Sequence, residues 1–269
     1  MSEETHQPPA GPQSAATRRV IAVGATLLSL GSIGFALQFY RNVGLLLFNE
    51  QFLAAMLALG MALVYLTQPI RKGMPRPVVP WYDWLLAGLS LALGLFIAVR
   101  YPELSENMTS RPLDGLVVAF ATIALLMEAL RRSVGYALMI VVAVFLFYGL
   151  IGHLVPGDLA GRPVKITQLA FYLVWDPGSM LGLPLMVATT IVIAFVFFGA
   201  LLFASGGSAF FTDIALTLMG RYRGGSAKIA VTASCLFGMI SGSAVSNVAS
   251  VGVITIPLMR RGGYPAHVA

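Results

Sequence analysis

Long apolar runs separated by short polar segments dominate the chain, and six of the runs have the length of a membrane-spanning helix. A helix needs about 20 mostly apolar residues to cross the hydrocarbon core of a bilayer. Charged stretches rich in Pro and Gly separate the runs. The pattern predicts an all-α integral membrane fold with about six transmembrane helices, at residues 20–39, 52–66, 84–99, 113–130, 134–151 and 183–203.

The last apolar block, residues 226–261, does not fit a simple span. Lys228 and Arg260 bracket 31 residues, which is too long for one span and too short for two spans and a turn. A single crossing would also place the two basic flanks on opposite sides, whereas Lys and Arg tend to remain cytoplasmic. We therefore expect a re-entrant helical hairpin, with short helices at about 228–240 and 248–259.

The bend of this hairpin, residues 241–247 (SGSAVSN), is rich in small and polar residues. Non-helical backbone at membrane depth is tolerated only against protein or a water-filled cavity. The free carbonyls that end the first helix suit a cation, and the free N–H groups that begin the second suit a carboxylate. Gly242 allows a tight turn, and Asn247 or Ser246 is the expected N-cap of the second helix. The alternative is that Ser and Gly only permit close helix packing.

Three further features of the pattern lead to local predictions. Residues 166–175 form an apolar run too short to span, which indicates an interfacial or a short buried helix. Residues 210–219 are amphipathic, and we expect a helix along the cytoplasmic face. Cys235, in the first hairpin arm, is expected to be a small packing residue, and a reactive thiol is the alternative.

Composition agrees with a membrane protein, since 58% of the 269 residues are hydrophobic and 10% are charged. The net charge of +6 does not indicate a nucleic-acid partner, because the cations lie in short loops between apolar runs. A single cysteine excludes an internal disulfide. Residues 1–17 are polar and Pro-containing, which predicts a disordered cytoplasmic tail.

Basic residues also predict the orientation of the chain. With the N-terminus in the cytoplasm, twelve Lys and Arg residues face the cytoplasm and five face outward. The cytoplasmic set includes Arg131, Arg132, Arg221 and Arg223. This asymmetry favours a multi-pass membrane protein with a cytoplasmic N-terminus.

Titratable residues give little indication of chemistry. Glu128 lies inside a predicted span, where it is either an ion relay or a helix-end carboxylate paired with Arg131 or Arg132, and its position near the helix end favours the pair. No metal-ligand spacing, nucleophile motif or phosphate-binding loop occurs in the sequence. We therefore expect neither an enzyme nor a cofactor.

Six sequence blocks resemble the permease of tripartite ATP-independent periplasmic (TRAP) transporters, in the fused form that pairs with TAXI-type solute-binding proteins. The last three blocks are the most specific. The blocks are EALRRSVG (128–135), YGLIGHLVP (148–156), FGA to SG (198–206), GRYRGGSAK (220–228), SGSAVSN (241–247) and TIPLMRRGGY (255–264).

The resemblance implies a sodium-coupled, elevator-type importer of organic anions such as dicarboxylates in a bacterial inner membrane, served by a periplasmic TAXI-type binding protein. Residues 18–132 would correspond to a four-helix small subunit, and residues 133–269 to the N-terminal part of the large-subunit transport domain. The bend would coordinate sodium and face the substrate carboxylate, with Ser243 and Asn247 as candidate sodium ligands. The residues carried over are Ser241, Gly242, Ser243, Ser246 and Asn247.

Members of the resembled family continue beyond the position of Ala269 into an inverted repeat with a second hairpin. The resemblance therefore implies that the chain holds about half of the transport machinery and needs the C-terminal half of the permease as a partner. A non-transporting membrane scaffold or assembly subunit is the alternative, and a channel with a re-entrant loop is a third reading that the scarcity of polar residues on the spans disfavours.

Overall fold

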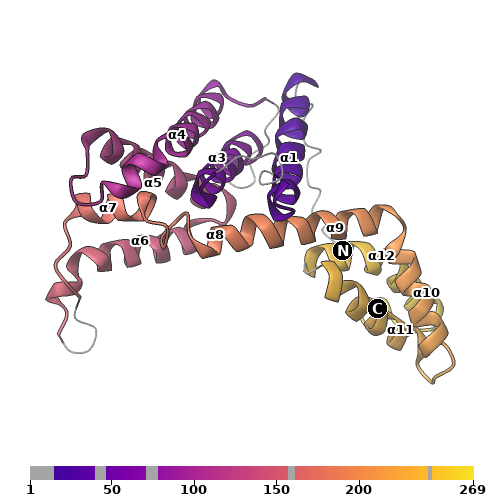
Figure 1. Cartoon of the computed structure of the whole chain (residues 1–269). Helices are drawn as coiled ribbons and strands as arrows, with labels where there is room; N and C mark the ends of the chain where they lie inside the picture. The colour runs from indigo at the N-terminus through magenta and orange to yellow at the C-terminus, as the bar shows by residue number, and fades with distance from the viewer. Residues whose placement is uncertain (1–14, 40–46, 71–77, 157–160, 242–243) are drawn as a thin grey trace. The chain divides into compact units, whose positions relative to one another are not determined.

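All regular structure in the computed structural model is helical (Figure 1). The structure describes residues 15–39, 47–70, 78–156, 161–241 and 244–269, and no strand occurs within these ranges. The chain divides into two compact units, Met1–Thr190 and Ile191–Ala269. The predicted all-α class is confirmed. Most of the predicted N-terminal tail lies outside the described residues, and the first helix begins at Ala15.

Among the described residues, six helical runs are long and apolar enough to cross a bilayer, as predicted. The third is longer than expected: it continues through Pro102 to Glu106, and an ion pair between Arg100 and Glu103 lies in this extension. The runs are α1 (Ala15–Ala36), α3 (Asn49–Thr67), α4 (Trp81–Glu106), α5 (Leu113–Ser133), Tyr136–Leu154 with α6 (Tyr136–Ile151), and Leu183–Leu202 with α8 (Leu183–Val187), a π-helical turn and most of α9 (Ile193–Ala204).

Helices α3 and α4 share the most extensive contact in the first unit, and small residues meet there. A Cβ built on Gly94 of α4 would lie 2.2 Å from the Cβ of Ala58 on α3. Ala54 and Ala87 are also buried. Small side chains let helix backbones approach closely in membrane proteins. This pair provides the surface on which α5 and α1 pack.

The short helix α7 (Ile166–Trp175) has the bounds that the sequence predicts. One face of it, including Phe171 and Trp175, is buried in a core shared with α3, α4 and α5. The indole N–H of Trp175 donates a hydrogen bond of 3.1 Å to the backbone oxygen of Gly115. Of the two alternatives for this segment, the structure therefore supports the buried helix.

A cluster of charged side chains joins α4 to α5, and we call Asp83, Glu128, Arg131 and Arg132 the charged cluster. Nη1 of Arg132 lies 2.6 Å from Oδ1 of Asp83, and the two side chains are 2% and 1% exposed. Glu128 accepts hydrogen bonds of 2.7 Å from both Arg131 and Arg132. The arginine pairing predicted for Glu128 is confirmed, whereas the sequence did not reveal that Asp83 pairs with Arg132.

Two of the apolar runs bury little surface within the chain. Only 6% of the most apolar window is buried in Tyr136–Leu154, and the same holds for Leu183–Leu202. No residue of α6 is buried. Such exposure is expected of helices whose solvent is lipid, which replaces water around apolar side chains.

The second unit packs α10 (Gly207–Met219), α11 (Gly225–Ser241) and α12 (Ala244–Arg261) around a small core. Phe237 of α11 and Val251 of α12 are almost fully buried there, together with Ala215, Ile229 and Ala233. A helix is therefore present where the amphipathic segment 210–219 predicted one.

Candidate functional site

The predicted hairpin segment folds back on itself within the second unit. Helices α11 and α12 pack against each other, and the start of the first lies beside the end of the second. A Cβ built on Gly262 would lie 2.5 Å from Oγ of Ser226. The two basic flanks predicted for one side, at Lys228 and Arg260, thus belong to the same end of the hairpin. A single straight helix through the block is excluded.

Glycines in left-handed backbone conformations lie where the first arm of the hairpin begins and where the second arm ends. Gly224 has a φ of 73°, and its backbone oxygen accepts hydrogen bonds from the N–H groups of Ala227 and Lys228 at the start of α11. Gly263 has a φ of 89°, and the N–H of Tyr264 donates to the oxygen of Met259. This second arrangement is a Schellman cap, which ends a helix by satisfying its last carbonyls.

The two arms are longer than the sequence predicts. Helix α11 has 17 residues and α12 has 18, which correspond to about 25–27 Å at 1.5 Å per residue. The bilayer core is about 30 Å thick, so each arm nearly matches it in length. Residues 225–227 and Ser241 extend the first arm, and residues 244–247 extend the second, although the sequence analysis assigned them to the flanks and the bend. The predicted N-cap at Ser246 or Asn247 is wrong, because α12 already begins at Ala244.

The structure locates the backbone of three predicted site residues. Ser241 is the last residue of α11, and Ser246 and Asn247 lie in the first turn of α12. Their side chains are outside the described residues, as are Gly242 and Ser243 altogether. The chemistry assigned to the bend therefore stays a prediction. The first four N–H groups of α12 and the last four carbonyls of α11 have no partner within their own helices, so the bend retains both kinds of helix end.

Cys235, on the first arm, does not pack as predicted. Its side chain is exposed, because the buried face of α11 is formed by Ile229, Ala233 and Phe237, spaced four residues apart.

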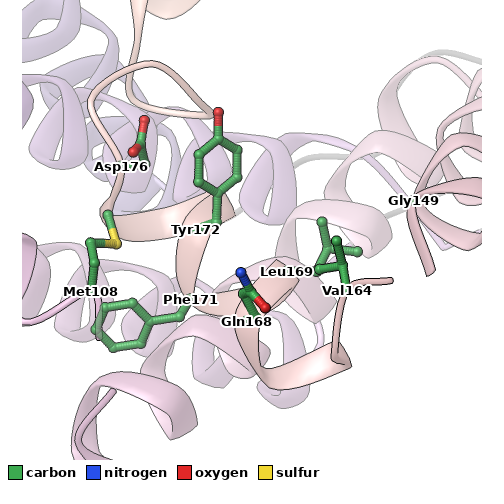
Figure 2. Close-up of a pocket in the computed structure, with 8 residues that line it drawn as sticks. All are labelled: Met108, Gly149, Val164, Gln168, Leu169, Phe171, Tyr172 and Asp176. Carbon is green, nitrogen blue, oxygen red and sulfur yellow. The ribbon is translucent and has the colours of Figure 1, made fainter. Parts of the chain in front are cut away.

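A cavity of about 460 Å³ lies in the first unit, around α7 (Figure 2). Among the described residues that line it, Asp176 carries the only charge, and one oxygen of Asp176 accepts a hydrogen bond of 2.8 Å from the N–H of Gly178. A cavity that is lined by one carboxylate and by mostly apolar side chains is unsuited to an organic anion. The other lining residues are Met108, Gly149, Val164, Gln168, Leu169, Phe171 and Tyr172.

Metal-binding side chains do not gather elsewhere in the part of the chain that the structure describes. No group of three or more His, Cys, Asp or Glu side chains there has the geometry to hold a metal ion. Any cation at the hairpin would therefore rely on backbone carbonyls, hydroxyls and amides, which are ligands that hard cations accept.

A comparison with protein families gives a match that covers the second unit and the part of the first unit from the middle of α5 onward. Residues 121–269, more than half of the chain, match the family described as Tripartite ATP-independent periplasmic transporter, DctM component. The chain belongs to this family. The DctM-component match contains the whole hairpin and begins within α5. The family is one of multi-pass inner-membrane permeases, not of enzymes, and it works with periplasmic solute-binding proteins.

Individual relatives are similar over shorter stretches. The uncharacterized protein y4mL of Sinorhizobium fredii is 30% identical over 150 residues, which are 56% of this chain and 31% of that protein. The C4-dicarboxylate TRAP transporter large permease protein DctM of Pseudomonas aeruginosa is 37% identical over 35% of this chain and 23% of its own length. The 2,3-diketo-L-gulonate TRAP transporter large permease protein YiaN of Escherichia coli is 32% identical over 34% and 20%.

These matches span a third or less of the length of each of these relatives. No solved structure matches the chain.

Proposed function

We propose that this chain is part of the permease of a sodium-coupled, binding-protein-dependent importer of organic anions. The observation that carries the proposal is the folded-back hairpin of α11 and α12, within a segment that matches the DctM-component family. A bend between two helices presents carbonyls and N–H groups together, which suits a coupling cation and a carboxylate. The names of two relatives, which specify C4-dicarboxylate and 2,3-diketo-L-gulonate, support a carboxylate as the substrate class.

The fused, TAXI-associated organisation is part of the same proposal. Residues 18–132 then act as the small-subunit region and residues 133–269 as the first part of the transport domain. A further part of the permease, carrying a second hairpin, completes the site opposite the bend. A periplasmic TAXI-type protein delivers the substrate, and the N-terminus faces the cytoplasm.

Uptake by the assembled transporter tests the role of the bend. We expect Asn247→Leu to abolish sodium-driven uptake in proteoliposomes that contain the complete permease and its binding protein, because the change removes a polar group at the start of α12. Membrane insertion should be unchanged. The matched control is Asn107→Leu, since Asn107 lies in an exposed turn after α4. Normal uptake by Asn247→Leu would contradict the proposed site.

The same assay separates transport from the scaffold alternative. A scaffold role predicts that the complete complex assembles and that substrate uptake is absent under every sodium gradient. Uptake that follows the sodium gradient and the presence of the binding protein supports the transport proposal.

The proposed topology has its own test by cysteine labelling. Cys235 is the only cysteine in the sequence, so Cys235→Ser gives a background without thiols. We expect cysteines introduced at Lys228 and at Arg260 to react with an impermeant maleimide from the cytoplasmic side only. Labelling of the two positions from opposite sides of inverted and right-side-out vesicles would refute the re-entrant arrangement.

A further inference from the structure

Five exposed cations gather at one end of the second unit. The end of α10, the start of α11 and the end of α12 meet there, as the contact between Ser226 and Gly262 and that between Gly224 and the Tyr264 hydroxyl indicate. Each of the five side chains is exposed. We call this set the basic end: Arg221, Arg223, Lys228, Arg260 and Arg261.

Acidic side chains do not balance the basic end. Asp213 is the only Asp or Glu between residues 191 and 269, and it lies six residues before the end of α10, about 9 Å along the helix axis. Within the described residues, every ion pair that forms lies in the first unit and none includes a cation of the basic end. The basic end is therefore available to an external anion.

A hollow of about 370 Å³ opens beside these cations, between the end of α10 and the first turns of α11. Lys228 lines it, and its ammonium group lies 5.2 Å from the centre of the Tyr222 ring. The rest of the lining is mostly apolar and includes Met219 and Val231. The side chain of Val231 is 65% exposed. A cation at one side and an exposed apolar surface at the other fit an amphipathic anion better than a small hydrophilic one.

We propose that the basic end binds an anionic phospholipid, with its phosphate at Lys228 and Arg223 and an acyl chain along Met219 and Val231. The chain is a membrane protein, and charged side chains avoid the hydrocarbon core, so the basic end lies at headgroup level. Ammonium and guanidinium groups there form charge-assisted hydrogen bonds to phosphate. The exposed ring of Tyr222 suits the same interfacial layer.

Lipid binding to the purified full-length chain tests the proposal. The chain is titrated in detergent with phosphatidylglycerol or with phosphatidylcholine of identical acyl chains, and bound lipids are counted by native mass spectrometry. Each cation near an anionic lipid contributes about fivefold in affinity. We therefore expect Arg223→Gln with Lys228→Gln to reduce the preference for phosphatidylglycerol by about 25-fold.

Two matched variants control for net charge and for folding. Arg162→Gln with Lys165→Gln removes two exposed cations from the first unit and should leave the preference unchanged. Arg223→Lys with Lys228→Arg keeps both charges and should retain it. If the neutral double variant fails to fold, the wild-type preference and the variant described next decide the question.

The acyl-chain part of the hollow distinguishes a lipid from a free phosphate. Val231→Asp places a carboxylate on the apolar side, and we expect it to weaken phosphatidylglycerol binding at least tenfold. Inorganic phosphate in large excess should displace little of the lipid. Equal wild-type affinity for the two lipids, full displacement by inorganic phosphate, or unchanged binding by Val231→Asp would each overturn the proposal.

Discussion

Replacing Arg132 by Met should cost the first unit about 3 kcal/mol or more of unfolding free energy. The guanidinium lies 2.6 Å from Asp83, and both side chains are almost fully buried. Breaking a buried ion pair from one side costs about 3–5 kcal/mol, because the remaining charge keeps its desolvation penalty. The loss of the guanidinium 5.0 Å from the Tyr65 ring adds to this, since a cation–π contact contributes about 0.5–2 kcal/mol. Glu128 is affected less, because it keeps its 2.7 Å contact with Arg131.

A double-mutant cycle gives the prediction its sharpest form. Asp83→Leu with Arg132→Met replaces the pair by apolar side chains, and such replacements are often neutral or stabilising. The double variant should therefore be more stable than Arg132→Met alone, as measured by unfolding of the full chain in mixed detergent and SDS micelles. Arg100→Met is the control, because Arg100 pairs with Glu103 and Asp114 at side chains that are 37–62% exposed, and such pairs contribute about 0–1 kcal/mol. Additive effects of the two cluster substitutions would refute the coupling.

Two glycine substitutions, followed by the same unfolding measurement, test the packing of α4 and the cap of α12. Gly94→Ala should destabilise the first unit by about 1–3 kcal/mol, since its Cβ would lie 2.2 Å from that of Ala58. Gly88→Ala is the control: a Cβ there would have no atom of another helix within 4 Å, so the change should be neutral or stabilise by up to about 1 kcal/mol. A larger loss of stability for Gly88→Ala than for Gly94→Ala would contradict the packing. Gly263→Ala should destabilise the end of α12 by about 1–2 kcal/mol because its φ is 89°, and an unchanged stability would mean that the cap is dispensable.

The sequence predicts features that depend on neighbouring residues. The bounds of α7 follow from an apolar run that ends at polar residues on both sides, Lys165 and Asp176. The pairing of Glu128 with Arg131 and Arg132 follows from the i+3 and i+4 spacing of a helix. Both features depend only on residues that are near one another in the sequence.

Features that depend on tertiary packing were not predictable in this way. Asp83 and Arg132 are 49 positions apart in the sequence, and their contact requires that the start of α4 lie beside the end of α5. The sequence gives only a weak indication of this contact: if α4 and α5 are consecutive antiparallel spans, the start of α4 and the end of α5 lie at the same side of the membrane. The exposure of Cys235 likewise depends on which face of α11 packs against α10 and α12. The extended arms of the hairpin arise because Ser, Ala and Val near the bend continue a helix that is supported by packing.

The arginines of this chain separate into two kinds that a count of charges does not distinguish. In the sequence, Arg131 and Arg132 belong to the same predicted cytoplasmic set as Arg221 and Arg223. The structure places the first two in the charged cluster, where Glu128 and Asp83 neutralise them, and it leaves the other two exposed with no carboxylate partner among the described residues. A cation that is already paired gains little from an anionic lipid, because binding would exchange one counter-charge for another. An anionic lipid should therefore bind more readily at the basic end than at the charged cluster, although both sets of cations lie at the ends of helices.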